Sequence, residues 1–103
     1  MEMHNAKRVE IIIEAPLEGR LADALDAADV PGYTVLPVRG GSGQSGRWTR
    51  EGQVSPGRGM VAVVVLLRPE RVEAVIDAAF EVLEPHIGII SVSDAQVVRP
   101  ERF

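Results

Sequence analysis

The stretch MVAVVVLL, residues 60–67, consists of eight apolar residues without a break. A run of this length suits a β-strand, because it is far shorter than the roughly 20 residues that a membrane-spanning helix needs. Successive side chains of a strand point to opposite faces of its sheet. Both alternate sets are apolar here (Val61, Val63 and Val65; Ala62, Val64 and Leu66). We therefore expect a strand whose two faces are both covered.

The residues before this run predict a strand, a helix and a strand. Lys7–Glu14 is rich in β-branched and apolar residues, which predicts the first strand. A helix is expected from Pro16, because apolar residues then recur at helical spacing (Leu17, Leu21, Ala24, Leu25 and Ala28). Pro31-Gly32 ends it, and Tyr33–Arg39 predicts the second strand. Pro37 cannot donate a ladder hydrogen bond, so its N–H side should face an edge.

The residues after the run predict a second helix and a last strand. Pro69 opens the helix, whose apolar face carries Val72, Val75, Ile76, Ala79, Phe80 and Leu83. Pro85–Gly88 predicts a turn, and Ile89–Arg99 predicts the strand. The order βαββαβ is that of an α+β, ferredoxin-like fold, with a four-stranded antiparallel sheet and both helices on one face. Its other face is apolar and has no helix, so we expect a second subunit to cover it.

The composition, with 46% hydrophobic and 25% charged residues, is typical of a globular protein, and we expect a single domain over residues 1–103. The absence of cysteine excludes disulfides, Cys-ligated zinc, iron–sulfur clusters and thiol catalysis. A net charge of −4 argues against bulk nucleic-acid binding. The N-terminus has no apolar signal-peptide core, and residues 1–6 are expected to be flexible. These features predict a cytoplasmic protein that does not insert into membranes.

Residues 40–58 follow neither the helical nor the strand period, and they contain six glycines. Loops of this length in a compact domain are usually functional or disordered. Gly41–Gly46 matches G-x-G-x-x-G, but no helix pattern follows to hold a dinucleotide. A P-loop is excluded because Arg47 and Trp48 replace its lysine and its hydroxyl residue. Two interpretations stay open: a flexible connector, or backbone amides and arginines that meet an anion.

Catalytic and metal-binding patterns are absent from the sequence. The two histidines lie far apart along the chain, and no His/Asp/Glu spacing resembles a metal site. The acidic residues are typical of solvated helix and strand faces, so we expect no enzyme. Trp48 either packs back onto the domain or anchors a partner. Arg99 ends the last strand, which this topology places beside the first, within reach of a cleft between subunits.

Three short segments, in order, resemble the PII signalling proteins. Gly32-Tyr33-Thr34-Val35 matches the G-x-T-V strand of that family. Gly40–Gly46 is similar to the start of its mobile T-loop, with Ser42 in place of the middle glycine, and Asp94–Arg99 is similar to its closing strand. The resemblance covers nearly the whole chain. It implies a homotrimer that binds adenine nucleotides between subunits and signals to a partner through a mobile loop at 40–58.

Departures from the family pattern narrow the expected ligands and the expected branch of the family. The loop has no tyrosine, so it cannot be uridylylated there, and Glu101 stands where a second basic residue is expected. Pro85–Gly88 replaces the glycine-and-lysine phosphate loop, which favours AMP or ADP as ligands, with ATP and cyclic AMP as further candidates. Together with Gly88-Ile89-Ile90, this is similar to the branches associated with bicarbonate transporters and carboxysomes. Bicarbonate is then a candidate second ligand, and a transporter or carboxysome component a candidate partner.

The resemblance also implies residue roles. Ile12, Thr34 and Leu66 would line the adenine and ribose region, and Gly88 and Arg99 would meet the phosphates. The expected nucleotide set is completed by residues at the loop root (Arg39, Gly40, Gly41, Ser42 and Gln44). Arg47, Trp48 and Arg58 are candidates for sensing a small anion or contacting a partner. The alternatives are a nitrogen-type PII regulator responding to ATP and 2-oxoglutarate, and a ferredoxin-like scaffold or enzyme without nucleotide.

Overall fold

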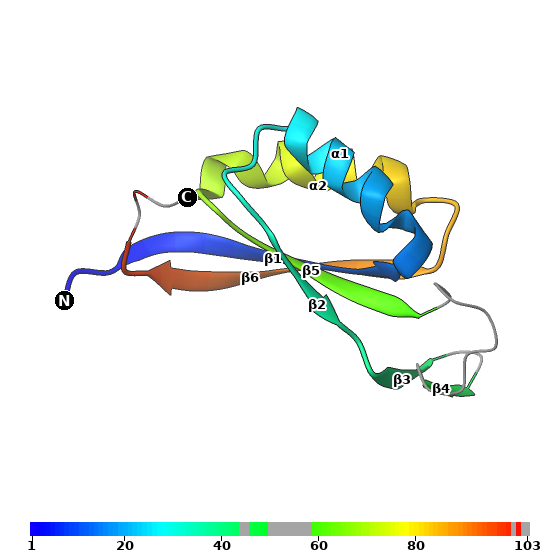
Figure 1. Cartoon of the computed structure of the whole chain (residues 1–103). Helices are drawn as coiled ribbons and strands as arrows, with labels where there is room; N and C mark the ends of the chain where they lie inside the picture. The colour runs from blue at the N-terminus through cyan, green and yellow to red at the C-terminus, as the bar shows by residue number, and fades with distance from the viewer. Residues whose placement is uncertain (44–45, 50–58, 100, 102–103) are drawn as a thin grey trace.

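One antiparallel sheet and one layer of helices make up the body of the chain (Figure 1). The computed structural model describes residues 1–43, 46–49, 59–99 and 101. The strand order in the main sheet is β2-β5-β1-β6. The elements are β1 (His4–Glu14), α1 (Glu18–Ala27), β2 (Thr34–Pro37), β3 (Gly40–Gly43), β4 (Gly46–Thr49), β5 (Met60–Leu67), α2 (Val72–Leu83) and β6 (Gly88–Val97).

The strand pairing confirms the ferredoxin-like order. β1 lies in the middle, with β5 on one side and β6 on the other, and all three pairings of the main sheet are antiparallel. The uninterrupted apolar run at residues 60–67 is β5, which lies between β1 and β2. β2 is an edge strand, so Pro37 is placed where a missing N–H is tolerated.

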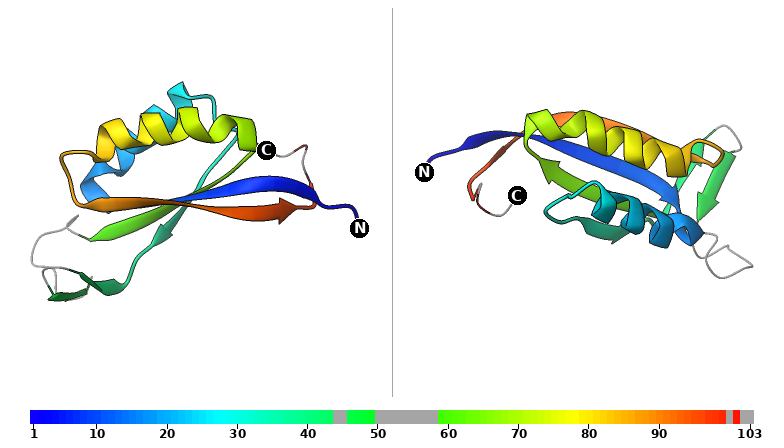
Figure 2. Two further views of the ribbon diagram at one scale, coloured as in Figure 1. Left: turned by 180° about the vertical axis from the view of Figure 1, so that it is seen from behind. Right: turned by 90° about the horizontal axis from the view of Figure 1, so that it is seen from above.

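The core lies between the sheet and the helices. Ile11 and Ile13 of β1 and Val65 of β5 have no exposed surface. They pack in one cluster with Leu21 and Leu25 of α1, together with Val75 and Ala79 of α2. Both helices lie on the same side of the sheet in every view (Figure 2). Burying each such aliphatic side chain stabilises the fold by roughly 1.5–3 kcal/mol, so this layer accounts for much of the stability.

The other face of the sheet is also apolar, and within the described residues no helix covers it (Figure 2). Leu36 is 45%, Leu66 39% and Ile89 60% exposed. Arg8 and Glu10 of β1 lie on the same face, where Arg8 Nη2 donates to Glu10 Oε2 over 2.8 Å. We refer to this surface as the open face.

Short 3-10 turns at Ala15–Leu17 and Pro69–Arg71 precede the two helices, so each proline stands just before its helix, as expected. The end of α1 is tied to the start of α2, because the Arg71 guanidinium donates to the carbonyl oxygen of Ala28. The prediction that Phe80 belongs to the buried face is wrong: it is 51% exposed. It lies at the margin of the apolar stripe, and Val82 is buried in addition to Leu83.

Two sequence-based boundaries also need correction. β1 begins at His4, and its first residues pair with the end of β6, so residues 4–6 are part of the sheet instead of a flexible terminus. Ala6 is only 2% exposed. Part of the segment expected to lack regular structure forms a two-stranded ladder, in which β3 pairs with β4. Short, glycine-rich strands carry no period-two pattern, which is why the sequence did not predict them.

Candidate functional site

A cavity of about 630 Å³ lies at the end of the sheet at which β2 begins and β6 ends. Thr34 of β2 and Val64 of β5 are register partners in the sheet, and the chain leaving β6 adds Arg99. Most of the wall is apolar, so this cavity suits a flat, weakly polar group beside one cation. Its lining residues are Pro31, Gly32, Tyr33, Thr34, Val64, Leu66, Val97, Val98 and Arg99.

Arg99 is the only basic residue among those lining residues. Its side chain is 66% exposed, and its Nε atom lies 3.6 Å from Glu101 Oε1. A solvated pair at this separation is weak, so the guanidinium can turn toward an anion at little cost. Arginine is well suited to this role, because its planar fork can hold two phosphate oxygens at once.

Gly88 lies at the other end of the sheet, and the packing around it admits only glycine. A β-carbon there would lie 2.2 Å from Leu83 Cδ1 and 2.6 Å from the carbonyl oxygen of Ile12. The turn before it is tied to the end of β1, because the Ile87 N–H donates to Glu14 Oε1 over 3.1 Å. The next residue, Ala15, donates its N–H to the Gly59 carbonyl over 2.7 Å. The end of β1 therefore contacts both this turn and the residue before β5.

The predicted nucleotide residues consequently fall into two groups. Thr34, Leu66 and Arg99 line the cavity. Ile12 and Gly88 lie together at the opposite end. Leu66 pairs with Arg8, four residues before Ile12 on β1, which corresponds to about 13 Å along the strand. A single chain does not bring the two groups together.

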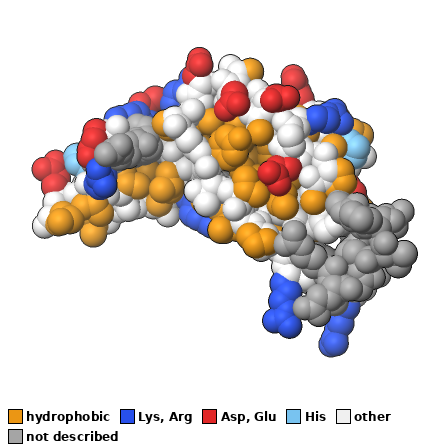
Figure 3. Space-filling view, in the orientation of Figure 1, with side chains coloured by type: hydrophobic (Ala, Val, Ile, Leu, Met, Phe, Trp, Pro, Cys, Tyr) orange, Lys and Arg blue, Asp and Glu red, His pale blue; other side chains and the backbone are white. Residues whose placement is uncertain are grey.

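Three of the loop-root residues lie in the ladder formed by β3 and β4. Gly40, Gly41 and Ser42 belong to β3, and Arg47 pairs with Ser42 across the ladder. Arg39 and Arg47 are exposed and form no ion pair with another described residue. Figure 3 shows basic side chains projecting from this region, whereas acidic side chains gather over the helices. Gln44, Arg58 and the side chain of Trp48 lie outside the described residues.

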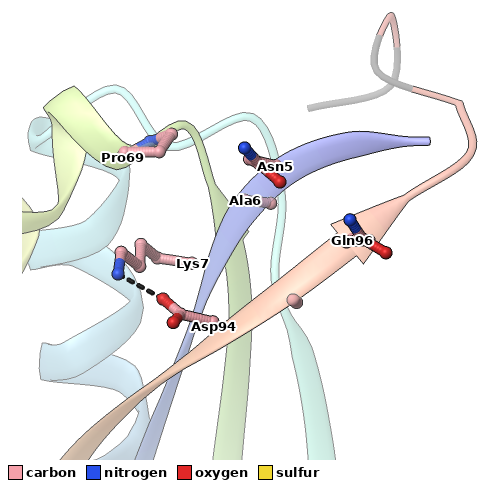
Figure 4. A pocket seen from close by; sticks show the side chains of 7 residues that line it. Asn5, Ala6, Lys7, Pro69, Asp94 and Gln96 are labelled. Carbon is pink, nitrogen blue, oxygen red and sulfur yellow. Dashed lines mark hydrogen bonds and ion pairs between the residues drawn. The ribbon is translucent and has the colours of Figure 1, made fainter.

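Sequence reasoning missed a second cavity, of about 570 Å³, beside the first residues of β1 (Figure 4). Asn5 and Gln96 contribute carboxamides, and Pro69 closes one side. Lys7 and Asp94 form an ion pair with each other across β1 and β6. Because its one cation is paired with a carboxylate of the same cavity, this site suits a phosphate less well than the cavity at Arg99.

Comparison with known proteins identifies the family of this chain. Residues 6–102 match the model of the family described as nitrogen regulatory protein P-II. The chain belongs to the PII family. No curated protein is similar enough in sequence to count as a match. Proteins of the PII family are typically trimers.

The solved structures that resemble this PII-family chain include CPII, a nitrogen regulatory PII-like protein from Thiomonas intermedia K12. CPII bound to ADP, AMP and bicarbonate has 27% sequence identity and a TM-score of 0.88, over 99% of this chain and 96% of CPII. CPII bound to ADP and bicarbonate has 29% identity and a TM-score of 0.83, over 99% and 97% of the two chains. A putative PII-like signaling protein from Thermus thermophilus has 26% identity and a TM-score of 0.80, over 100% and 99%.

The helices of the chain serve to cover the sheet. In the part of the chain that the structure describes, no helix has the length and apolar character that crossing a bilayer requires. α1 has 10 residues and α2 has 12, and the apolar stripe of each faces the core.

Proposed function

We propose that this chain is a PII-like regulatory protein that binds adenine nucleotide, with AMP and ADP as its main ligands. The observation that carries the proposal is the cavity at Arg99, which combines an apolar wall with one available guanidinium. An adenine ring fits the apolar wall, and a phosphate fits the cation. The proposal is supported by the resemblance to CPII, whose structures contain ADP, AMP and bicarbonate.

The complete site is proposed to form between subunits of a homotrimer. Thr34, Leu66 and Arg99 of one chain would face Ile12 and Gly88 of a neighbour across a shared cleft. Two features support this arrangement: the residues are split between the ends of the sheet, and the apolar open face has no cover among the described residues. Covering that face with another copy would remove its exposed leucine and isoleucine side chains from water.

We extend the proposal to the process that the protein regulates. Nucleotide and bicarbonate would control a partner in inorganic-carbon uptake or in the carboxysome, in the cytoplasm, through segment 40–58. Arg39 and Arg47 support this role for the hairpin, because they are exposed and have no carboxylate partner among the described residues. Bicarbonate is a small anion of the kind that such arginines bind.

The proposed activity is binding and not catalysis. A ligand shifts a regulatory equilibrium only by its difference in affinity for the two states, so the protein needs no reacting group. Arg99 and Thr34 are suited to holding a ligand.

Calorimetry with AMP, cyclic AMP, ADP and ATP, with and without bicarbonate, tests the proposal. We expect AMP and ADP to bind, and Arg99→Ala to weaken both by at least about tenfold, as for a charged hydrogen bond of about 1.5–3 kcal/mol. Arg20→Ala is the matched control, since Arg20 is an exposed arginine on α1 away from the cavity. An unchanged affinity in Arg99→Ala would refute the phosphate assignment.

The same titrations separate the alternatives. A wild-type protein that binds ATP tightly, and more tightly with 2-oxoglutarate, would be a nitrogen-type PII regulator. The family description is that of nitrogen regulators, which is the observation that favours this second candidate. No binding of any of the four nucleotides would instead favour a scaffold or enzyme of the same fold.

A further inference from the structure

A carboxylate lies beside the turn at which the family resemblance would place the nucleotide phosphates. The turn runs from Glu84 to Gly88 between α2 and β6. Its Ile87 N–H is directed at the side chain of Glu14, with 3.1 Å between the nitrogen and Oε1. Glu14 comes from the last position of β1, so the contact joins segments 73 residues apart in the sequence.

The backbone on both sides of this contact is held by the sheet. Gly88 follows Ile87 directly and lies against the Ile12 carbonyl, with no room for a β-carbon. Glu14 is held by the β1 ladder, in which it pairs with Met60. The backbone on both sides of the contact is therefore held at the sheet, and the Glu14 carboxylate accepts the Ile87 N–H from there.

Exposed backbone N–H groups in a turn are the usual receptors for phosphate oxygens. Here one of these donors already has an anionic acceptor, and the turn Glu84-Pro85-His86-Ile87-Gly88 contains no lysine or arginine to offset it. A phosphate that approaches Gly88 meets a negative charge. Each further phosphate on the nucleotide adds charge, so the repulsion grows from AMP to ATP.

We infer that Glu14 is a specificity-determining residue, whose carboxylate at the Ile87 N–H disfavours polyphosphates and so selects adenine nucleotides with few phosphates. This inference rests on the proposed function, since it concerns the same nucleotide site. The size of the effect follows from Coulomb's law. Two unit charges about 6 Å apart in water change an equilibrium by roughly threefold, and ATP carries about two more charges than AMP.

Glu14→Gln is the decisive variant, because it removes the charge and keeps an oxygen that can accept the Ile87 N–H. Calorimetric titrations with AMP, ADP and ATP give the ratio of the ATP to the AMP dissociation constant. We expect this ratio to fall by about three- to tenfold in Glu14→Gln, mainly through tighter ATP binding. Glu14→Ala, which also frees the N–H, should lower the ratio at least as far.

Glu73→Gln is the matched control. It makes the same change in net charge from an exposed position in the first turn of α2, at the end of that helix remote from the turn. The ratio of the ATP to the AMP dissociation constant of this variant should equal that of the wild type. The ratio of the ATP to the AMP dissociation constant should also differ less between Glu14→Gln and the wild type when the salt concentration is raised from about 0.05 to 0.5 M, because salt screens the charges.

The outcomes separate the two proposals. If the wild type binds AMP and Glu14→Gln has the same ratio of dissociation constants as the wild type, the role of Glu14 is overturned. The proposed nucleotide site would not be affected by that result. A wild-type protein that binds none of the three nucleotides would overturn both. Circular dichroism and thermal unfolding of Glu14→Gln, compared with those of Glu73→Gln, show whether the variant is folded, so an unchanged ratio cannot be attributed to misfolding.

Discussion

Both faces of the main sheet carry large apolar residues, yet they differ in what covers them. Ile11 has no exposed surface, whereas its neighbour Ile12, which points to the open face, is only partly buried. Likewise, Val65 is fully buried and Leu66 is 39% exposed. One face packs against helices of the same chain, and the other has no cover among the described elements.

This difference shows how a small domain distributes its apolar residues. The helix-covered face stabilises the single chain, because its side chains leave water when the chain folds. The open face contributes fully only when a second molecule covers it. A chain of 103 residues has a core of modest size, and association offers it further stability.

The largest effect is expected on the helix-covered face. Ile11→Ala should lower the free energy of unfolding by about 2–5 kcal/mol, since it leaves a cavity in a fully buried cluster. Ile89→Ala is the matched control on the open face, where the side chain is 60% exposed. Urea denaturation at several protein concentrations measures both. Equal losses for both variants at the lowest concentration would contradict the distinction between the faces.

The second prediction concerns association through the open face. Leu36→Asp places a carboxylate where an apolar side chain is 45% exposed, so the single chain should keep its secondary structure by circular dichroism. The homotrimer proposed above should weaken by roughly a hundredfold or more, because each interface would bury an unpaired charge. Sedimentation velocity of wild type and variant measures this. A variant that still sediments as the wild type does would exclude Leu36 from any interface.

The third prediction uses the Arg8–Glu10 ion pair on the open face. In the single chain these side chains are 38% and 28% exposed, so Glu10→Gln should change the free energy of unfolding by only about 0–1 kcal/mol. Covering the face would leave Arg8 buried without its carboxylate, and the trimer should dissociate about tenfold more readily. Sedimentation equilibrium tests this. The double variant Arg8→Met/Glu10→Leu should restore association, and its failure to do so would argue against burial of the pair.

The smallest effect is expected for the ion pair outside the open face. Lys7 and Asp94 pair across β1 and β6 with 37% and 87% of their side chains exposed. Asp94→Asn should change the free energy of unfolding by about 0–1 kcal/mol and leave the trimer intact. Thermal unfolding and sedimentation of this variant provide the comparison with Glu10→Gln. A weakened trimer in Asp94→Asn would place an interface at this edge as well.

Much of the fold could be predicted from periodicity alone. The four main strands, both helices and their order were predicted, because long apolar patterns dominate the choice of secondary structure. Residues 4–6 and the β3–β4 hairpin were not, since their pairing depends on neighbours and not on their own pattern. Gly46, the first residue of β4, has a φ of 96°, which is a backbone conformation that glycine adopts more readily than other residues.

The candidate site was predicted only in part. Thr34, Leu66 and Arg99 do line one cavity. The separation of these residues from Ile12 and Gly88 follows from strand register, which a sequence does not display. The contact between Glu14 and the turn before Gly88 was missed because its partner is a backbone N–H remote in the sequence.

The sequence by itself determined that this chain forms a βαββαβ domain with a strand apolar on both sides, and that Gly88 and Arg99 lie near opposite ends of its last strand. These features are local, so composition and spacing are enough to reveal them. Only the tertiary structure decided which apolar face is covered within the chain, and that a carboxylate lies beside the turn before Gly88. Both depend on which remote segments the register brings together, and that is a property of the packed chain.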